Sequence, residues 1–302
     1  MVDIRHILCP IDLSLTSRRA LDHAVMLAGW YGARLTALHV CNPLYLPEPP
    51  ILFAEAPHPN RAAEPSARDG LEAQLHEWLA RARAAGIDTK VEIDQSHNPA
   101  ARILQCAGAL PADLIVLGTH GRSGFERFML GSITERVLRK AACPVLTVPP
   151  PAIRTTKLPF KRLLCPVDFS ETSISALQFA FSIAKESDAH LTILYVIEWP
   201  RNDEMVVDSA LDIPEYRERL EQDLTLRLQA LISEDERTWC EPTTRVMYGK
   251  PYQRIVEVAE NDEEDLIVMG VHGRNAVDVM LFGSTTNQTV RRAPCPVLTL
   301  RR

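Results

Sequence analysis

The chain carries the same glycine pattern twice, and this duplication limits the fold more than any other feature of the sequence. The first copy begins Gly118-Thr119-His120-Gly121 and reaches Gly131-Ser132 after nine further residues. The second copy, Gly270-Val271-His272-Gly273, reaches Gly283-Ser284 at the same spacing. Each copy follows an apolar run and precedes a helical pattern. A glycine loop between a strand and a helix is a phosphate-binding layout, so the sequence predicts a duplicated nucleotide-binding module.

The repeat extends well beyond the glycines. Residues 7–14 match residues 163–170, and residues 34–40 match residues 190–196, both at an offset of 156. The glycine patterns and the closing Cys-Pro-Val-Leu-Thr runs, which start at Cys143 and Cys295, are offset by 152. A long period that occurs only twice indicates domain duplication and not a solenoid.

A proline-rich stretch marks the boundary between the copies. Residues 149–159 contain four prolines and no apolar periodicity, as expected of an extended linker. We therefore predict a first domain over residues 1–149, a linker over 150–159 and a second domain over 160–302.

Apolar runs alternate with helical patterns in each half. In the first half we expect strands at 4–10, 34–40, 90–94, 113–117 and 144–148, and helices at 17–31, 68–85, 99–108 and 132–142. This alternation predicts an α/β fold, a five-stranded parallel sheet with helices on both faces in each domain. Such Rossmann-like sheets bind ligands at the carboxyl ends of their strands, where the strand order reverses. The closing strands, 144–148 and 296–300, are predicted to be sheet edges, which readily pair with other strands.

Composition excludes several classes of protein. The net charge of −6 argues against a dedicated nucleic-acid binder, and no apolar run approaches the length of a membrane span. The charged first residues lead directly into a strand, so we expect no signal peptide and a cytoplasmic location. Seven cysteines without a Cys-x-x-Cys pair make a disulfide framework unexpected. The paired cysteines, Cys9 with Cys165 and Cys143 with Cys295, are read as small buried side chains, with a redox or metal role as the alternative.

The glycine patterns suit the binding of an anion such as phosphate. Glycine lets a phosphate approach the backbone, and the free N–H groups at a helix N-terminus attract anions. Ser132 is predicted to be the N-cap of its helix, with Glu135 completing a capping box, and Ser284 holds the same place in the second half. A plain turn that caps a helix is the structural alternative. The chain has neither a Walker A lysine nor the Gly-x-Gly-x-x-Gly fingerprint, so nothing obvious clamps phosphates for transfer.

An acidic residue ends the first strand of each half. Asp12 and Asp168 stand in a shared Pro-x-Asp-x-Ser pattern that begins at Pro10 and Pro166. A carboxylate there can accept hydrogen bonds from a ribose or an adenine amine. Its structural alternative is a cap for the helix that follows.

Two further features remain open. The proline-rich segment 42–65 leaves the second strand near the predicted ligand edge, where it is a lid, a partner surface or an insertion. His120 and His272, inside the glycine loops, are read as general acids or metal ligands, or as packing residues. No Ser-His-Asp set or carboxylate cluster repeats between the halves, so we predict no committed catalytic apparatus.

Together these patterns resemble a tandem universal stress protein, with two such domains covering nearly all of the chain. The resemblance rests on Pro-x-Asp-x-Ser, the Asp-Leu-Ile-Val strands, Gly-x2-Gly-x9-Gly-Ser and the Cys-Pro-Val-Leu-Thr strands. The family fold is a five-stranded parallel α/β sandwich, and the glycine motif is typical of its ATP-binding branch. In family members the fifth strands often form a dimer contact. The resemblance thus implies an internal pseudo-dimer, with a homodimer of two chains as a further assembly.

The resemblance also implies ligand-binding residues. Asp12 and Val40 would hold the adenosine in the first half, and Asp168 and Val196 would hold it in the second, with Pro10 and Pro166 beside them. The phosphates would lie against the glycine motifs, at Gly118, Gly121, Arg122, Gly131, Ser132, Ile133 and Thr134, and at Gly270, Gly273, Gly283, Ser284, Thr285 and Thr286. The implied cofactor is ATP, with Mg²⁺ as an optional companion of its phosphates.

The halves depart from the family pattern in different ways. The second half keeps Gly249-Lys250-Pro251, whereas the first has His97-Asn98-Pro99, and the first glycine loop carries one more arginine than the second. The leading hypothesis is a stress-response protein that binds ATP or a related adenine nucleotide as a sensor or regulator, with a tighter site in the first half. The alternatives are a weak ATPase and a scaffold for another ligand, such as a metal or an apolar metabolite.

Overall fold

The computed structural model describes residues 3–41, 67–119, 130–150, 152, 160–198, 214–240, 242–271 and 282–301. Several predicted features lie outside these ranges. They are segment 42–65, most of the linker, and the glycine-loop residues His120, Gly121, Arg122, His272 and Gly273.

Both halves alternate strands and helices, as the α/β prediction requires. The first half contains β1 (His6–Pro10), α1 (Leu15–Tyr31), β2 (Arg34–Cys41), α2 (Ala67–Trp78), α3 (Ala80–Ala84), β3 (Thr89–Gln95), α4 (Pro99–Ala109), β4 (Leu114–Gly118), α5 (Ser132–Lys140) and β5 (Val145–Val148). The second half contains β6 (Arg162–Pro166), α6 (Glu171–Ser187), β7 (His190–Ile197), α7 (Pro214–Gln229), α8 (Glu234–Cys240), β8 (Thr243–Tyr248), α9 (Pro251–Asn261), β9 (Leu266–Gly270), α10 (Ser284–Arg292) and β10 (Val297–Leu300). The predicted single helix over 68–85 is wrong in one respect, because a turn at the buried Leu79, with φ −90° and ψ 0°, divides it into α2 and α3.

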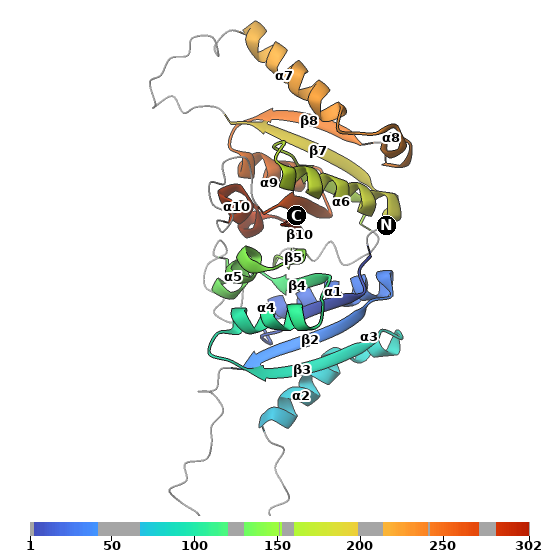
Figure 1. The fold of residues 1–302 in the computed structure, drawn as a ribbon, viewed down its shortest axis with the longest axis vertical. Helices are drawn as coiled ribbons and strands as arrows, with labels where there is room; N and C mark the ends of the chain where they lie inside the picture. The colour runs from blue at the N-terminus through green and yellow to red at the C-terminus, as the bar shows by residue number, and fades with distance from the viewer. Residues whose placement is uncertain are drawn as a thin grey trace, which may run out of the picture.

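The described strands form a single ten-stranded sheet in the order β3-β2-β1-β4-β5-β10-β9-β6-β7-β8. All pairings within each half are parallel, but β5 and β10 pair antiparallel, with Leu146 opposite Leu298. The prediction that these closing strands are sheet edges is wrong, since they lie at the centre of the sheet, with one half on each side (Figure 1). The expected contact between the two closing strands is present, and it is formed within one chain.

The β5–β10 junction has local two-fold symmetry. The Thr147 hydroxyl donates to the carbonyl of Val297 at 3.1 Å, and the Thr299 hydroxyl donates to the carbonyl of Val145 at 3.2 Å. Both threonines are fully buried. Each half therefore contributes the same bond to the other, as in an isologous interface.

Helices cover both faces of the sheet, and one apolar core lies on each face (Figure 1). Strand β4 shows how the sequence builds both cores. Leu114 and Val116 belong to the core under α1, α2 and α6, whereas Ile115 and Leu117 belong to the core under α4, α5, α9 and α10. Successive side chains of a strand point to opposite faces, so a strand between two helical layers must be apolar throughout.

The aspartate before each Leu-Ile-Val run ties two strands together at their amino ends. Asp113 Oδ2 accepts the backbone N–H groups of Arg5 and His6 at 2.8 and 2.9 Å. Asp265 Oδ2 accepts those of Lys161 and Arg162 at 2.7 and 3.0 Å. The repeated aspartate therefore fixes the start of β1 against β4 and of β6 against β9.

A narrow apolar crevice of about 30 Å³ lies between the halves. Its lining includes equivalent residues from both copies: Ile4 and Phe160, Leu27 and Ile183, Leu114 and Leu266, and Leu146 and Leu298. Ligand pockets usually measure hundreds of Å³, so this crevice is too small for a cofactor or metabolite. Among the described residues, no helix has both the length and the apolar character that crossing a membrane requires.

Candidate functional site

Those predicted site residues that the structure describes lie, in each half, where the strand order reverses. Strand β1 pairs with β2 on one side and with β4 on the other. Strands β2 and β3 therefore extend the sheet in one direction from β1, and β4 and β5 extend it in the other. Pro10 ends β1, Gly118 ends β4, and Val40 is half-buried near the end of β2. Pro166, Gly270 and Val196 hold the same places on β6, β9 and β7. Open α/β sheets bind ligands at such a point.

The helix that follows each glycine loop starts directly beside the strand that precedes the loop. The backbone N–H of Gly131 donates to the carbonyl of Thr119 at 2.9 Å, and the buried Thr134 hydroxyl donates to the carbonyl of Gly118 at 2.8 Å. In the second half, Gly283 donates to Val271 at 3.0 Å and Thr286 to Gly270 at 2.9 Å. Both ends of each glycine loop therefore meet at one place on the sheet edge.

The N-caps of α5 and α10 differ from the prediction. The cap positions are Gly131 and Gly283, so Ser132 and Ser284 are the first helical residues and the predicted capping box is wrong. Glu135 instead lies 3.9 Å from Arg139, one turn along α5. The first intrahelical bonds run from the N–H of Glu135 to Gly131 and from that of Asn287 to Gly283. The N–H groups of residues 132–134 and 284–286 thus precede the helical ladder, and no cap side chain reaches them.

Close packing favours glycine at the ends of β4 and β9. A Cβ on Gly118 would lie 2.7 Å from Thr16 Cγ2 and 3.2 Å from the Thr16 backbone. A Cβ on Gly270 would lie 3.0 to 3.1 Å from Thr172. These two glycines let the start of α1 and of α6 approach the sheet edge, whatever else they contact.

The acidic residues after β1 and β6 organise a tight turn. Asp12 Oδ1 accepts the N–H of Ser14 at 3.0 Å, and Ser14 in turn caps α1 by accepting the N–H of Ser17 at 3.1 Å. Asp168 Oδ1 accepts the N–H of Ser170 at 3.0 Å and its hydroxyl at 2.6 Å. Serine is thus the N-cap, and the aspartate supports it from two residues upstream. In both turns the Oδ1 oxygen of the aspartate makes these bonds.

Sequence reasoning missed the residues that support this turn. Leu13 and Phe169, between the aspartate and the serine, have φ values of 65° and 62°, which non-glycine residues rarely adopt. His39 is buried beneath the first turn, with Nδ1 2.7 Å from the carbonyl of Ile11. At the equivalent position in the second half, the Tyr195 ring lies 5.2 Å from that of Phe169. His39 and Tyr195 could have been identified from their positions in the sequence, because each directly precedes the valine expected at the adenosine.

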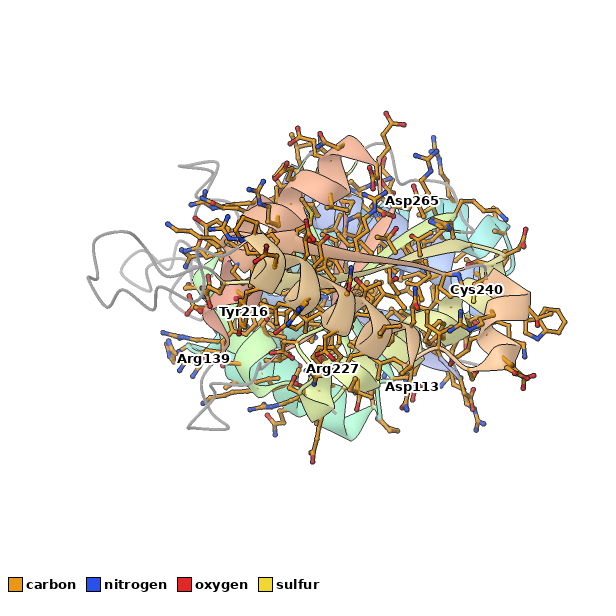
Figure 2. All side chains as sticks on the ribbon, turned by 90° about the horizontal axis from the view of Figure 1, so that it is seen from above. Asp113, Arg139, Tyr216, Arg227, Cys240 and Asp265 are labelled. Carbon is orange, nitrogen blue, oxygen red and sulfur yellow. The ribbon has the colours of Figure 1, made fainter. Side chains whose placement is uncertain are left out.

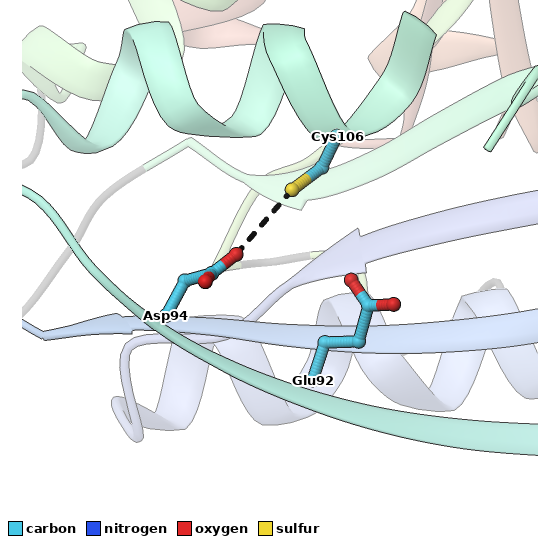
Figure 3. A group of neighbouring side chains, drawn as sticks. All are labelled: Glu92, Asp94 and Cys106. Atoms are coloured by element: carbon cyan, nitrogen blue, oxygen red, sulfur yellow. Dashed lines mark hydrogen bonds between the residues drawn. The ribbon is translucent and has the colours of Figure 1, made fainter. Parts of the chain in front are cut away.

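One cluster of metal-ligand type lies away from this site. Glu92 and Asp94 on β3 and Cys106 on α4 place ligand atoms within 4.8 Å of one another (Figure 3). Arg102 already supplies a positive charge, since its guanidinium contacts Asp94 Oδ2 at 2.7 Å, and Lys90 pairs with Glu92 at 2.6 Å. The cluster is therefore an ion-pair network at the outer edge of the sheet.

The cysteines that the repeat pairs are mostly interior. Cys9, Cys165 and Cys295 are buried free thiols, and burial raises the pKa of each well above its usual range. Cys143 is half-buried, and burial raises its pKa to about 11. A raised pKa disfavours the reactive thiolate, which agrees with the reading of these cysteines as small packing residues.

Relatives that match this chain extend over nearly all of it. A universal stress protein of Mycobacterium tuberculosis is 26% identical over 296 residues, covering 97% of this chain and 95% of its own. One of Mycolicibacterium smegmatis is 27% identical over 300 residues, covering 98% and 96%. Among solved structures, a universal stress protein of Archaeoglobus fulgidus has a TM-score of 0.63 at 23% identity, covering 98% of this chain and 96% of that one, which shows the shared fold.

The family assignment rests on two matches that together cover nearly the full length. The sequence model of the universal stress protein family matches residues 3–149 and again residues 159–301. The repeated sequence, the α/β fold of both halves and these two matches agree, and the chain belongs to the universal stress protein family.

Proposed function

We propose that this protein binds an adenine nucleotide, ATP in the first instance, at the carboxyl edge of each half and acts as a cytoplasmic nucleotide-dependent regulator. The bound nucleotide would shift the population of conformations that a partner recognises. We propose the domain limits 1–149 and 160–302 for the two binding units, joined by the linker 150–159.

The observation that carries this proposal is the glycine at the N-cap of α5 and of α10. Gly131 has φ −59° and ψ 137°, and Gly283 has φ −55° and ψ 138°. These backbone angles are open to any residue, so glycine is not needed for its conformational freedom. Serine or aspartate would normally stand here and cap the helix. A glycine in both copies leaves the first-turn N–H groups to an external anion and removes the Cβ that would obstruct it.

The surrounding residues fit a nucleotide. Phosphates at α5 would accept hydrogen bonds from the backbone of Ser132, Ile133 and Thr134, since Ser132 and Ile133 are exposed at the start of the helix. The Thr134 hydroxyl already bonds to Gly118, so only its N–H is assigned to the ligand. The Asp12 carboxylate and the end of β2 at Val40 would take the ribose and the base. Mg²⁺ would be held through the phosphates, and no residue is assigned to phosphoryl transfer.

The test uses a substitution with opposite effects on capping and on binding. Gly131→Asp and Gly283→Asp in one chain introduce a good N-cap, which should leave stability unchanged or raise it by a few tenths of a kcal/mol per helix. The same carboxylates would repel the phosphates, so we expect calorimetric heat on ATP addition to disappear. Gly70→Asp is the matched control, because Gly70 lies in the first turn of α2 with open space around it. The proposal fails if nucleotide-free wild-type protein shows no heat with ATP, or if the doubly substituted chain binds as the wild type does.

A further inference from the structure

The turn after β6 is held in an unfavourable conformation. Phe169 has φ 62°, in the left-handed region that a non-glycine residue rarely adopts. It lies between Asp168, the carboxylate proposed to hold the adenosine, and Ser170, the N-cap of α6. Such a conformation persists only where the surroundings fix it, so the contacts of the Phe169 ring act together with the hydrogen bonds of Asp168 to Ser170 and Ser173 in fixing this turn.

Two elements far away in the sequence hold this ring. The guanidinium carbon of Arg227, on α7, lies 4.3 Å from the centre of the Phe169 ring. The Tyr195 ring, on β7, lies 5.2 Å from it at an angle of 37°. Figure 2 looks down on α7, with Tyr216 and Arg227 along its length. Helix α7 therefore contacts the acidic turn through a cation–π pair.

The first half supports the equivalent turn differently. Leu13 has the same unusual φ, but it offers no ring to a cation. The His39 Nδ1–H donates instead to the carbonyl of Ile11, one residue before Asp12. The corresponding cation–π pair, Arg18 with Trp78 at 4.9 Å, joins α1 to α2. Among the described residues, only the second half places an arginine against the acidic turn. That arginine belongs to α7, the helix that follows β7.

We propose that Arg227 is a positioning residue for the nucleotide site of the second half. It acts through Phe169, whose ring it holds so that Asp168 is aligned for the adenosine. Docking of α7 and nucleotide binding in the second half are then coupled, and nucleotide should strengthen the docking of α7 in return. This inference rests on the proposed function for its effect on affinity, but not for its effect on the turn.

Hydrogen exchange with mass spectrometry, on the full chain, separates the two halves in one experiment. Arg227→Gln removes the cation, Arg227→Lys retains it, and Arg219→Gln is the matched control, an exposed arginine on the same helix. Without nucleotide, we expect Arg227→Gln to speed exchange across residues 168–173 about two- to five-fold, the range of an exposed cation–π pair. With ATP, we expect the concentration for half-protection to rise by the same factor in the second half and to stay unchanged across residues 10–17. For Arg227→Lys, we expect both the exchange rate of residues 168–173 and the ATP concentration for half-protection to lie close to the wild-type values.

Each outcome decides between the claims. If Arg227→Gln behaves as Arg219→Gln does in both arms, Arg227 is not a positioning residue. If it weakens protection equally in both halves, the effect is on general stability and the inference is also wrong. If ATP protects neither half of the wild-type chain, the proposed function fails. The nucleotide-free exchange of residues 168–173 then still decides whether Arg227 holds the turn.

Discussion

Glu264 is a buried carboxyl group in the second half, at the position that Ala112 occupies in the first. It is 5% exposed, and its Oε2 atom has no hydrogen-bond partner among the described residues. Burial raises its pKa to about 7. A hydrogen bond from Thr192 opposes this rise, nearby Asp262 adds to it, and Arg162 and Arg245 oppose it. The two copies therefore differ in a titratable group that lies far from the nucleotide edge.

This glutamate should make the stability of the second half depend on pH. Its folded pKa of about 7 lies above the ordinary 4.5, so the folded state binds the proton more tightly. The stabilisation is fully present below pH 4.5 and is lost as the pH rises through 7. Glu264→Gln cannot ionise, so we expect the substituted chain to lose less stability between acidic and alkaline pH, by up to about 3 kcal/mol. Urea unfolding at about pH 5 and about pH 8 measures this difference. Glu260→Gln, at an exposed position, is the control. Parallel pH profiles of wild type and Glu264→Gln would contradict the prediction.

At the scale of elements, the sequence predicts the strands and helices that local patterns define. It does not predict features that depend on contacts between residues distant in the chain. The strands and most helices follow from apolar runs and from glycine or proline at their ends, because these are local properties. The division of the 68–85 helix at Leu79 does not, since a buried leucine is an ordinary helix residue. The predicted N-cap of α5 was wrong by one residue, because a contact distant in the chain fixes the true one. Ser132 and Glu135 match the pattern, but the tie between Gly131 and Thr119 fixes where α5 begins.

The candidate site could be predicted to the same extent. Its glycines and aspartates follow from the motif, because both copies repeat the spacing. The roles of His39, Phe169 and Arg227 do not, since they arise from packing between elements distant in the chain. The contact between β5 and β10 was implied by the family resemblance as an internal pseudo-dimer, but its antiparallel register is seen only in the folded chain.

The threonine that ties α5 to β4 gives a test at this scale. Thr134→Val keeps the shape of the buried side chain but removes the hydroxyl that donates to the partly buried carbonyl of Gly118, which should cost about 1 to 3 kcal/mol. We also expect weaker nucleotide binding in the first half, because the start of α5 would no longer be fixed beside the strand. Thr134→Ser retains the hydroxyl and should behave nearly as the wild type. Chemical unfolding and calorimetry with ATP measure the two effects, and equal behaviour of the Val and Ser variants would refute this role.

For the whole molecule, the central pairing makes two homologous domains share one sheet. Leu146 and Leu298 are opposite each other on β5 and β10, and both are buried. Since each closing strand completes the other half's core, we expect the two halves to unfold together.

A charge at this junction should separate the two unfolding events. Leu146→Lys places an ammonium group in the buried junction, where an unpaired charge is strongly disfavoured. We expect the single thermal transition of the wild type to become two transitions in the calorimeter. Leu15→Lys is the control, because Leu15 is 81% exposed, and it should leave the transition unchanged. A single transition in Leu146→Lys would show that the halves are coupled elsewhere.

Assembly of two chains into a homodimer stays a prediction. The strands that the family resemblance assigned to dimer contact are paired with each other here, and β3 and β8 are the outermost described strands. A homodimer built on the closing strands would require the β5–β10 pair to open. Light scattering distinguishes a 33.8 kDa monomer from a species of twice that mass.

The crevice between the halves shows what fusing two copies into one chain permits. In a dimer of identical chains, every side chain on one side of the axis has an identical counterpart on the other, so one substitution always changes both sides. Here Ile4 has Phe160 as its counterpart, and Leu27 has Ile183, around a centre where Leu146 still faces Leu298. A large ring on one side can thus be accommodated by a smaller side chain on the other. Each half is free to diverge in shape and sequence while the joint between them remains closed.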